Sequence, residues 1–258
     1  MNTLINRYAF AVWLRNFLTW QKMVWSSLAS NVVNPVIFLF AFGFGLGSVI
    51  ETMAGVPYLA FIVPGMMAYG AMFSSSFEAT VSAYARFQMQ RTWDAMLSTP
   101  LTLSELLVGE LVWSACKGML SCTAVLVVAA IWGGVSSIAG GLLALPVLML
   151  ASLAFAGCGL AATAFARNWE FFSYFFTFWI TPMFMFSGVF FEIGRFPDFI
   201  QVFAWILPMT HLVEVIRPLM IGLALQPLDV MIHLGYLAAV TVVSFIVALH
   251  RLRRRLFD

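Results

Sequence analysis

The sequence has 258 residues, of which 62% are hydrophobic and only 9% are charged, and its formal net charge is +2 at pH 7. With a mean hydropathy of +0.97, the chain has too little polar surface to cover a soluble globule of this size, because soluble domains carry roughly 25% charged residues. The composition excludes an ordinary soluble protein and favours an integral membrane protein.

The first predicted element is an amphipathic helix over residues 4–26. Its cationic residues, Arg7, Arg15 and Lys22, lie among Phe and Trp residues, and this mixture is typical of helices at the depth of the lipid headgroups. We expect the helix to lie in the membrane interface without crossing the bilayer.

Six further segments are apolar and long enough to cross a bilayer, for which a helix needs about 20 residues. The predicted spans are residues 29–50, 58–84, 105–131, 138–165, 170–190 and 228–250. The fold class expected from them is an all-α integral membrane protein, with residues 1–258 forming one transmembrane domain.

The basic residues predict the orientation of these spans. Arg195 and Arg217 fall on one side of the membrane, and eleven basic residues fall on or nearest the other: Arg7, Arg15, Lys22, Arg86, Arg91, Lys117, Arg167, Arg251, Arg253, Arg254 and Arg255. Because basic residues accumulate on the cytoplasmic side, both termini are predicted to be cytoplasmic. The basic residues form no separate basic face, so nucleic acid is not an expected partner.

Two charged residues lie well within the predicted spans, Glu78 in the second and Lys117 in the third. Charges are costly in hydrocarbon and tend to pair. We expect an interhelical salt bridge between them, although separate snorkelling of each side chain towards the cytoplasm stays open as the alternative.

The cytoplasmic segment 86–100 has helical spacing and ends at Pro100, after which Thr102 and Glu105 have the spacing of a capping box. It predicts a short helix outside the bilayer. The helix has a large apolar face, formed by Phe87, Trp93, Met96 and Leu97. Such a face indicates insertion into a groove of a soluble protein, and a helix resting on lipid is the alternative.

The external segment 188–227 is too apolar to be a free loop, and we expect it to fold back into the outer leaflet as two short helices separated near Pro208. His211, Glu214 and Arg217 recur at spacings of three, on one face of the second helix. An ion pair between Glu214 and Arg217 that holds an external gate together is favoured over a metal site, since no further His or Cys is near in sequence.

The fifth span begins with a dense run of aromatic residues that includes Tyr174, Phe178 and Trp179. Aromatic faces stack on sugar rings and pack along acyl chains, so these residues are candidates for lining a path. An aromatic belt or packing between two copies explains the same pattern.

Motifs for nucleotide or covalent chemistry are missing from the sequence. A P-loop needs Gly-Lys-Ser/Thr, but Lys22 precedes Met23 and Lys117 precedes Gly118. We find neither a nucleophile elbow nor a zinc-binding helix motif. The chain is therefore predicted to be no enzyme and to bind no cofactor of its own.

Two parts of the sequence resemble one known family. The stretch RTWDAMLSTPL at residues 91–101, followed by LVGE at 107–110, resembles the coupling region of type-2 ABC exporter permeases. The order TPMFMFSGVFF at 181–191, FP at 196–197 and LPMTHLVEVIRP at 207–218 is similar to the signature of that family. Within the family the chain is most similar to the nodulation-type permeases of lipo-oligosaccharide exporters, with Glu192-Ile193 departing from the more usual proline.

The resemblance implies a half-transporter in a bacterial inner membrane. Two copies would pair around a path open to membrane lipids, above two ABC ATPase subunits that bind ATP and Mg. The cargo would be a lipo-oligosaccharide, glycolipid or polysaccharide-like amphiphile; a drug or amphiphile efflux permease and an ion-coupled carrier are the alternatives. The residues expected to act are Arg91, Trp93, Asp94, Met96 and Leu97 in coupling, Tyr174, Phe178, Trp179 and Phe186 in the path, and Glu192, His211, Glu214 and Arg217 in the external gate.

Overall fold

The structure is a computed structural model that describes residues 5–257, with side chains described for residues 8–25 and 33–256. Nearly all of it is helical. Among the described residues, the strands are limited to β1 (Thr52–Met53) and β2 (Val56–Pro57), which pair antiparallel around a turn where Ala54 and Gly55 have positive φ.

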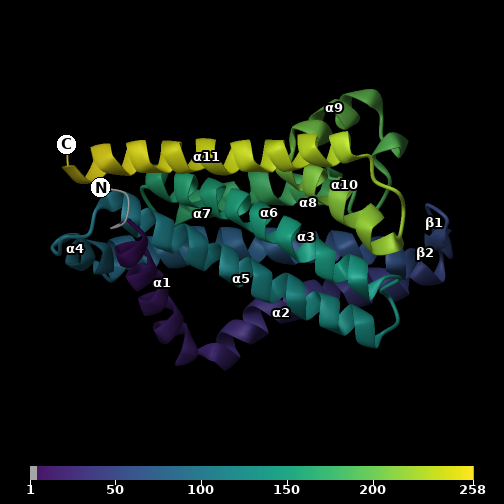
Figure 1. Cartoon of the computed structure of the whole chain (residues 1–258), viewed down its shortest axis with the longest axis horizontal. Helices are drawn as coiled ribbons and strands as arrows, with labels where there is room; N and C mark the ends of the chain where they lie inside the picture. The colour runs from purple at the N-terminus through teal and green to yellow at the C-terminus, as the bar shows by residue number, and fades with distance from the viewer. Residues whose placement is uncertain (1–4, 258) are drawn as a thin grey trace.

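Four helices are long and apolar enough to cross a membrane within the described range. They are α3 (Tyr58–Phe77, extended to Met89), α5 (Leu103–Ile131), α6 (Ile138–Phe165) and α11 (Pro227–Phe257). These helices confirm that the chain is an α-helical membrane protein, and they coincide with four of the six predicted spans. Figure 1 shows α11 running along most of the length of the bundle.

The first and fifth predicted spans are shorter and less regular helices. The first consists of α2 (Val24–Phe40) followed by a π-helical turn (Ala41–Gly45) and a 3₁₀ turn (Leu46–Ser48). The fifth consists of α7 (Glu170–Phe175), a π-helical turn (Phe176–Ile180) and α8 (Thr181–Phe186). π-Helical turns carry one extra residue and tend to occur at functional positions.

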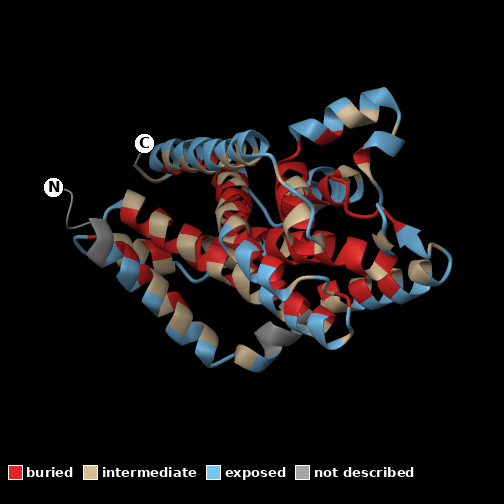
Figure 2. Ribbon diagram, turned by 45° about the vertical axis from the view of Figure 1, so that its right-hand side comes forward, coloured by how far each residue is buried: buried red, intermediate tan, exposed pale blue. Residues whose placement is uncertain are grey.

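The helix α3 forms the centre of the bundle. Of its most apolar window, 89% is buried, compared with 6% for α11, which lies at the surface. Figure 2 shows this contrast as a buried central helix flanked by helices with exposed outer faces. Two π-helical turns, Glu78–Ser82 and Ala85–Met89, extend α3 beyond Phe77.

The N-terminal helix α1 (Ile5–Gln21) packs on α5 at an angle to the bundle (Figure 1). The close approach depends on Gly109, where an added Cβ would lie 2.6 Å from Cβ of Val12. The predicted helix over residues 4–26 is too long at its C-terminal end, because the chain turns at Lys22 and Met23 and α2 begins at Val24.

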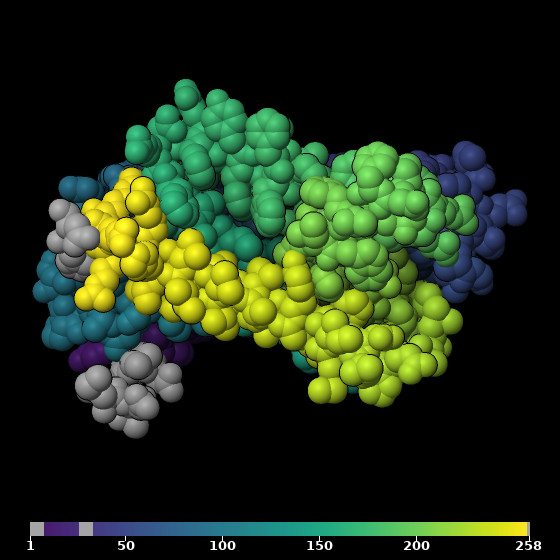
Figure 3. All heavy atoms as spheres, turned by 90° about the horizontal axis from the view of Figure 1, so that it is seen from above, coloured from purple at the N-terminus to yellow at the C-terminus, as the bar shows by residue number. Residues whose placement is uncertain are grey.

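The segment before α11 contains two helices, α9 (Asp198–Ile206) and α10 (Pro208–Ile221), which meet at 90°. Pro208 causes this break, since it holds the preceding Leu207 in an extended conformation. A 3₁₀ turn (Ile193–Arg195) precedes α9, and α10 ends at Gly222, whose φ is +78°. Seen from above in Figure 3, α11 crosses this face, and α9 and α10 lie at the end opposite the C-terminus.

The short helix α4 (Thr92–Leu97) lies at the same end of the bundle as the start of α1 and the end of α11, and the β1–β2 hairpin lies at the other end (Figure 1). The predicted capping box is confirmed, because Thr102 and Glu105 exchange hydrogen bonds at the start of α5. This end of the bundle therefore presents α4 between two long helices.

Candidate coupling site

The helix α4 begins after a sharp turn at Arg91, whose φ of +52° is left-handed. This conformation is uncommon for a residue with a side chain, and it reverses the chain between the extension of α3 and α4. An ion pair of 3.1 Å joins Nε of Arg91 to Oδ2 of Asp94 at the surface. Ala95, Ser98 and Thr99 are exposed as well, so one face of α4 is open to solvent.

Trp93 lies on the opposite face of α4 and is completely buried. Its ring stacks on Phe87 at 5.0 Å between centroids, and its Nε1 donates a 3.1 Å hydrogen bond to Glu110 in α5. Met96 and Leu97 are half-buried against the same apolar cluster. The expectation that the Trp93 side chain inserts into a groove of a partner is wrong, because its indole packs within its own chain. A role of Trp93 in coupling stays a prediction.

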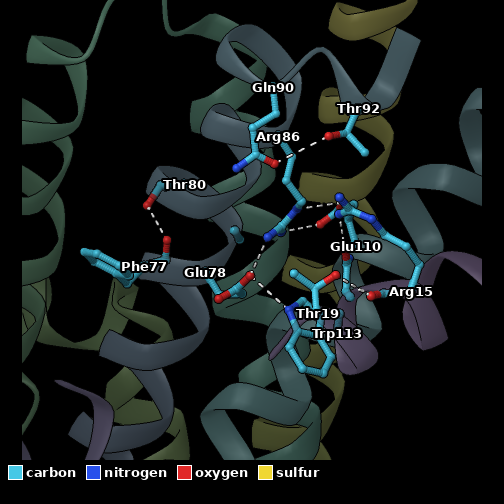
Figure 4. Close-up of polar contacts among 12 residues, drawn as sticks. Arg15, Thr19, Phe77, Glu78, Thr80, Arg86, Gln90, Thr92, Glu110 and Trp113 are labelled. Atoms are coloured by element: carbon cyan, nitrogen blue, oxygen red, sulfur yellow. Dashed lines mark hydrogen bonds and ion pairs between the residues drawn. The ribbon is translucent and has the colours of Figure 1, made fainter. Parts of the chain in front are cut away.

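Glu110, which accepts the hydrogen bond from Trp93, belongs to a buried ion-pair network with Arg86 and Glu78 (Figure 4). Arg86 forms a bidentate ion pair with Glu110, in which Nε lies 3.1 Å from Oε1 and Nη2 lies 2.6 Å from Oε2. Its Nη1 lies 2.7 Å from Oε1 of Glu78. Trp113 donates a 2.9 Å hydrogen bond to the same Glu78 oxygen. Each carboxylate thus receives both a guanidinium and an indole N–H.

The structure corrects the expected partner of Glu78, which forms its ion pair with Arg86 and not with Lys117. The Lys117 ammonium lies 5.4 Å from the ring centroid of Trp20. The π-helical turns after Glu78 bring Arg86 back to the side of the helix that faces α5. Arg86, which the sequence places at the membrane edge, therefore becomes the central cation of a buried network.

Glu110 was not singled out from the sequence, although it is 0% exposed and central to the network. The signal was present, because Glu110 is a carboxylate within the apolar segment 105–131 and such a group needs a cation close by. The sequence does not show which cation pairs with Glu110; in the structure it is Arg86, 24 residues earlier in the chain.

Arg217 is buried, and its guanidinium bonds to backbone carbonyl groups. Its Nη2 donates to the carbonyls of Gly188 at 2.6 Å and Val189 at 3.1 Å, and the guanidinium lies 3.9 Å from the ring centroid of Phe61. The expected ion pair with Glu214 is wrong, since Arg217 turns inward to carbonyls that no helix or sheet partner satisfies. The Arg217 side chain thereby ties α10 to the loop after α8.

The other predicted gate residues lie in two places. Glu192, Glu214 and Arg217 line a common cavity of about 390 Å³, and Glu192 also contacts Arg195 at 3.5 Å. His211 lies apart from them, with its Nδ1 2.8 Å from Nδ1 of His233 and its Nε2 2.9 Å from the carbonyl of Trp205. Within the described residues, no group of three or more His, Cys, Asp or Glu residues has the geometry of a metal site.

The predicted path residues also divide into two groups. Tyr174 and Phe178 are exposed and stack with an interplanar angle of 13°, and Trp179 is exposed beside them. Phe186 packs instead edge-on against Phe196 and Phe203, at the base of α9. The aromatic face of α7 and the following π-helical turn is therefore open at the surface, whereas Phe186 supports the segment that precedes α11.

Comparison with known proteins gives the class of protein to which this chain belongs. Residues 8–221 match the model of the ABC-2 type transporter family, and the chain belongs to that family. It is the transmembrane permease of an ABC transporter and an integral protein of the bacterial inner membrane.

Two relatives cover almost the whole chain. Nodulation protein J of Rhizobium leguminosarum bv. viciae is 42% identical over 247 residues, which are 95% of this chain and 94% of that protein. Nodulation protein J of Rhizobium meliloti (strain 1021) is 42% identical over 246 residues, with 95% and 93% covered. The inner membrane transport permease YadH of Escherichia coli (strain K12) is more distant, at 22% identity over 218 residues and 84% of each chain.

Proposed function

We propose that the chain is the membrane half of an ATP-driven exporter that moves a lipo-oligosaccharide, or a related glycolipid or polysaccharide-like amphiphile, out of the cytoplasm. Two copies of the chain form the path, and two copies of a separate ABC ATPase bind and hydrolyse ATP with Mg. The identity of 42% to nodulation protein J over nearly the full length supports this assignment.

The proposed topology has six crossings with both termini in the cytoplasm. The crossings are the segments of α2, α3, α5, α6, α7 with α8, and α11, while α9 and α10 fold back into the outer leaflet. The start of α1, the end of α11 and α4 lie at one end of the bundle in Figure 1, which supports a cytoplasmic position for all three.

The contact between α4 and the buried ion pairs is the observation that carries the mechanism. The outer face of α4, with Arg91, Asp94 and Ala95, docks on the ATPase. On its inner face Trp93 is bonded to Glu110, and Glu110 is bonded to Arg86 of the α3 extension. A displacement of α4 by the ATPase therefore moves α3 and α5 together, because buried charge-assisted hydrogen bonds resist separation. Met96 and Leu97 pack behind α4 and stiffen this link.

The same proposal assigns the outer residues. Glu192, Glu214 and Arg217 line the cavity at the far end, where they act as an external gate held shut by the Arg217 contacts, with His211 bracing α10 against α11. Tyr174, Phe178 and Trp179 face the path between the two copies, and Phe186 supports its outer end.

A substitution on the exposed face of α4 tests the function. Ala95→Glu places a charge where the ATPase is proposed to dock, so the purified variant is expected to lose both bound ATPase and amphiphile-stimulated ATP hydrolysis. Ser136→Glu, in the exposed loop between α5 and α6, is the matched control and keeps both. An Ala95→Glu variant that retains ATPase and export disproves the docking face. If the permease alone exports the cargo with an ion gradient and without any ATPase, the chain is instead an ion-coupled carrier.

A further inference from the structure

A cavity of about 380 Å³ opens between α1, the extension of α3, and α5. This volume lies within the range of about 300–1,000 Å³ that is common for small-molecule sites. The residues that shape its polar half are Arg15, Asn16, Trp20, Glu78, Trp113 and Lys117. Figure 4 shows Glu78, Arg86 and Trp113 turned towards one another at its inner wall.

Three N–H donors of α1 are buried without an acceptor among the described residues: Nε1 of Trp13, Nδ2 of Asn16 and Nε1 of Trp20. Asn16 is 3% exposed, and its Oδ1 accepts a 2.9 Å hydrogen bond from Arg15. Because a guanidinium has donors only, the amide orientation is determined, and Nδ2 is left without a partner. A buried donor with no acceptor destabilises the protein, and a ligand rich in oxygen acceptors removes that cost.

The charges around the cavity favour a ligand with many oxygen atoms that accept hydrogen bonds. Arg15, Arg86 and Lys117 line it together with a single carboxylate, Glu78. Burial lowers the pKa of Arg15, and the nearby Arg86 cation lowers it further, although Glu110 acts in the opposite direction. The Trp20 and Trp113 rings, 6.2 Å apart, add aromatic surface on which a sugar ring can rest.

An apolar groove lies beside this cavity and shares two lining residues with it. Its volume is about 480 Å³, and it runs between the extension of α3 and α7. Phe73 and Phe77 line both the cavity and the groove. The rest of the groove is formed chiefly by Val81, Trp169, Phe172 and Phe176. The described residues that line the groove include no charged side chain, so a phosphate head group has no ion-pair partner in it, whereas an acyl chain has the required apolar wall.

We infer that the cavity and the groove bind one amphiphile, with an oxygen-rich saccharide head group against α1 and its acyl chain along α7. This inference rests on the proposed function and specifies where its cargo binds: the hydroxyl and amide oxygens of the saccharide accept from Asn16 and Trp20. Because α1 is proposed to lie at the cytoplasmic interface, the site collects the cargo from the inner leaflet before export.

Binding of radiolabelled hexadecyl β-maltoside to the permease–ATPase complex in phosphatidylcholine nanodiscs, without ATP, tests the inference. Trp20→Phe keeps the aromatic ring and removes one donor, and Asn16→Leu removes the other. Each is expected to weaken binding about three- to tenfold, as the loss of one hydrogen bond does. Gln21→Leu, an exposed amide on the same helix, leaves the affinity unchanged. Should Asn16→Leu fail to fold, Trp20→Phe alone decides.

Two comparisons separate the head-group cavity from the groove and from a general lipid site. Ser173→Phe, which fills the groove, is expected to weaken hexadecyl β-maltoside and hexadecylphosphocholine alike. Unchanged affinity of Trp20→Phe for hexadecyl β-maltoside overturns the inference. If Trp20→Phe weakens the binding of phosphatidylglycerol as much as that of the maltoside, the cavity is a site for anionic lipids, and the inference is overturned as well. Because this binding requires no ATP, a negative result with normal ATPase coupling disproves the loading site and leaves the proposed function intact.

Discussion

Nε1 of Trp93 and Oε1 of Glu110 are 3.1 Å apart, and this hydrogen bond joins the surface helix α4 to the membrane helix α5. Trp93→Phe preserves the stacking on Phe87 and removes the bond, so the free energy of unfolding is expected to fall by about 1.5–3 kcal/mol, the value for hydrogen bonds to charged groups. Chemical denaturation in detergent measures this loss, and ATP hydrolysis with reconstituted ATPase measures coupling. Wild-type values in both assays would show that the bond transmits no movement.

Removal of the Glu110 carboxylate is expected to be more damaging. Glu110→Ala leaves the Arg86 guanidinium with Glu78 as its one remaining carboxylate in a buried setting, and breaking a buried pair in this way costs about 3–5 kcal/mol. Asp94→Ala breaks the exposed ion pair with Arg91 and is expected to cost less than about 1 kcal/mol. Thermal unfolding of both variants in the same detergent compares them. Equal losses would mean that the network adds no particular stability.

The apolar segments, the capping box and the proline at the α9–α10 break could be predicted because each depends on nearby residues. Hydropathy finds α3, α5, α6 and α11, which are long and apolar. The segments of α2 and of α7 with α8 were predicted as full spans, but their π-helical and 3₁₀ turns interrupt regular helix geometry, and a hydropathy pattern does not reveal such turns.

The candidate site was less predictable because its contacts depend on which way a side chain turns. The apolar face of segment 86–100 looks the same whether it meets another protein or its own chain, so the burial of Trp93 was missed. Spacing of three placed Arg217 near Glu214, but burial directs the guanidinium to the carbonyls of Gly188 and Val189. The sequence favours Lys117 as the partner of Glu78 because it does not reveal the π-helical turns, which determine the side of the helix on which Arg86 lies.

Arg217 should stabilise the outer end of the bundle chiefly through its carbonyl contacts. Arg217→Met keeps an apolar stem and removes the donors, so the free energy of unfolding is expected to fall by about 1–3 kcal/mol for the buried carbonyls left unpaired. Glu214→Gln is expected to change it by less than about 0.5 kcal/mol, as for an ordinary surface substitution. Denaturant titration of the two variants is the measurement, and a large effect of Glu214→Gln would restore the expected ion pair.

The contact between α1 and α5 should tolerate no side chain at Gly109. Gly109→Val must displace Val12 or the carbonyl of Ala9, which lie 2.6 and 2.7 Å from the added Cβ, and overpacking of this kind costs about 1–3 kcal/mol. Gly194→Ala, where an added Cβ meets nothing within 4 Å, is the control. Thermal unfolding and limited proteolysis after α1 report the effect, and a fully stable Gly109→Val would contradict the close packing.

The proposed orientation predicts opposite accessibility for two exposed positions. Ser98→Cys, just after α4, should react with a membrane-impermeant maleimide only when the cytoplasmic side is opened, whereas Gly194→Cys should react in intact spheroplasts. Cys122 and the half-buried Cys116 and Cys158 lie within membrane helices and are expected to give little background. Labelling of Ser98→Cys in intact spheroplasts would reverse the topology.

The two π-helical turns between Glu78 and Met89 set a strict demand on chain length. A regular α-helix advances about 100° per residue, so deletion of one residue such as Ala83 would rotate Arg86 and everything after it by roughly that angle. The guanidinium would then point away from α5, and both carboxylates would lose their cation at once. Homologous permeases that retain this network should therefore hardly vary in the number of residues along this stretch.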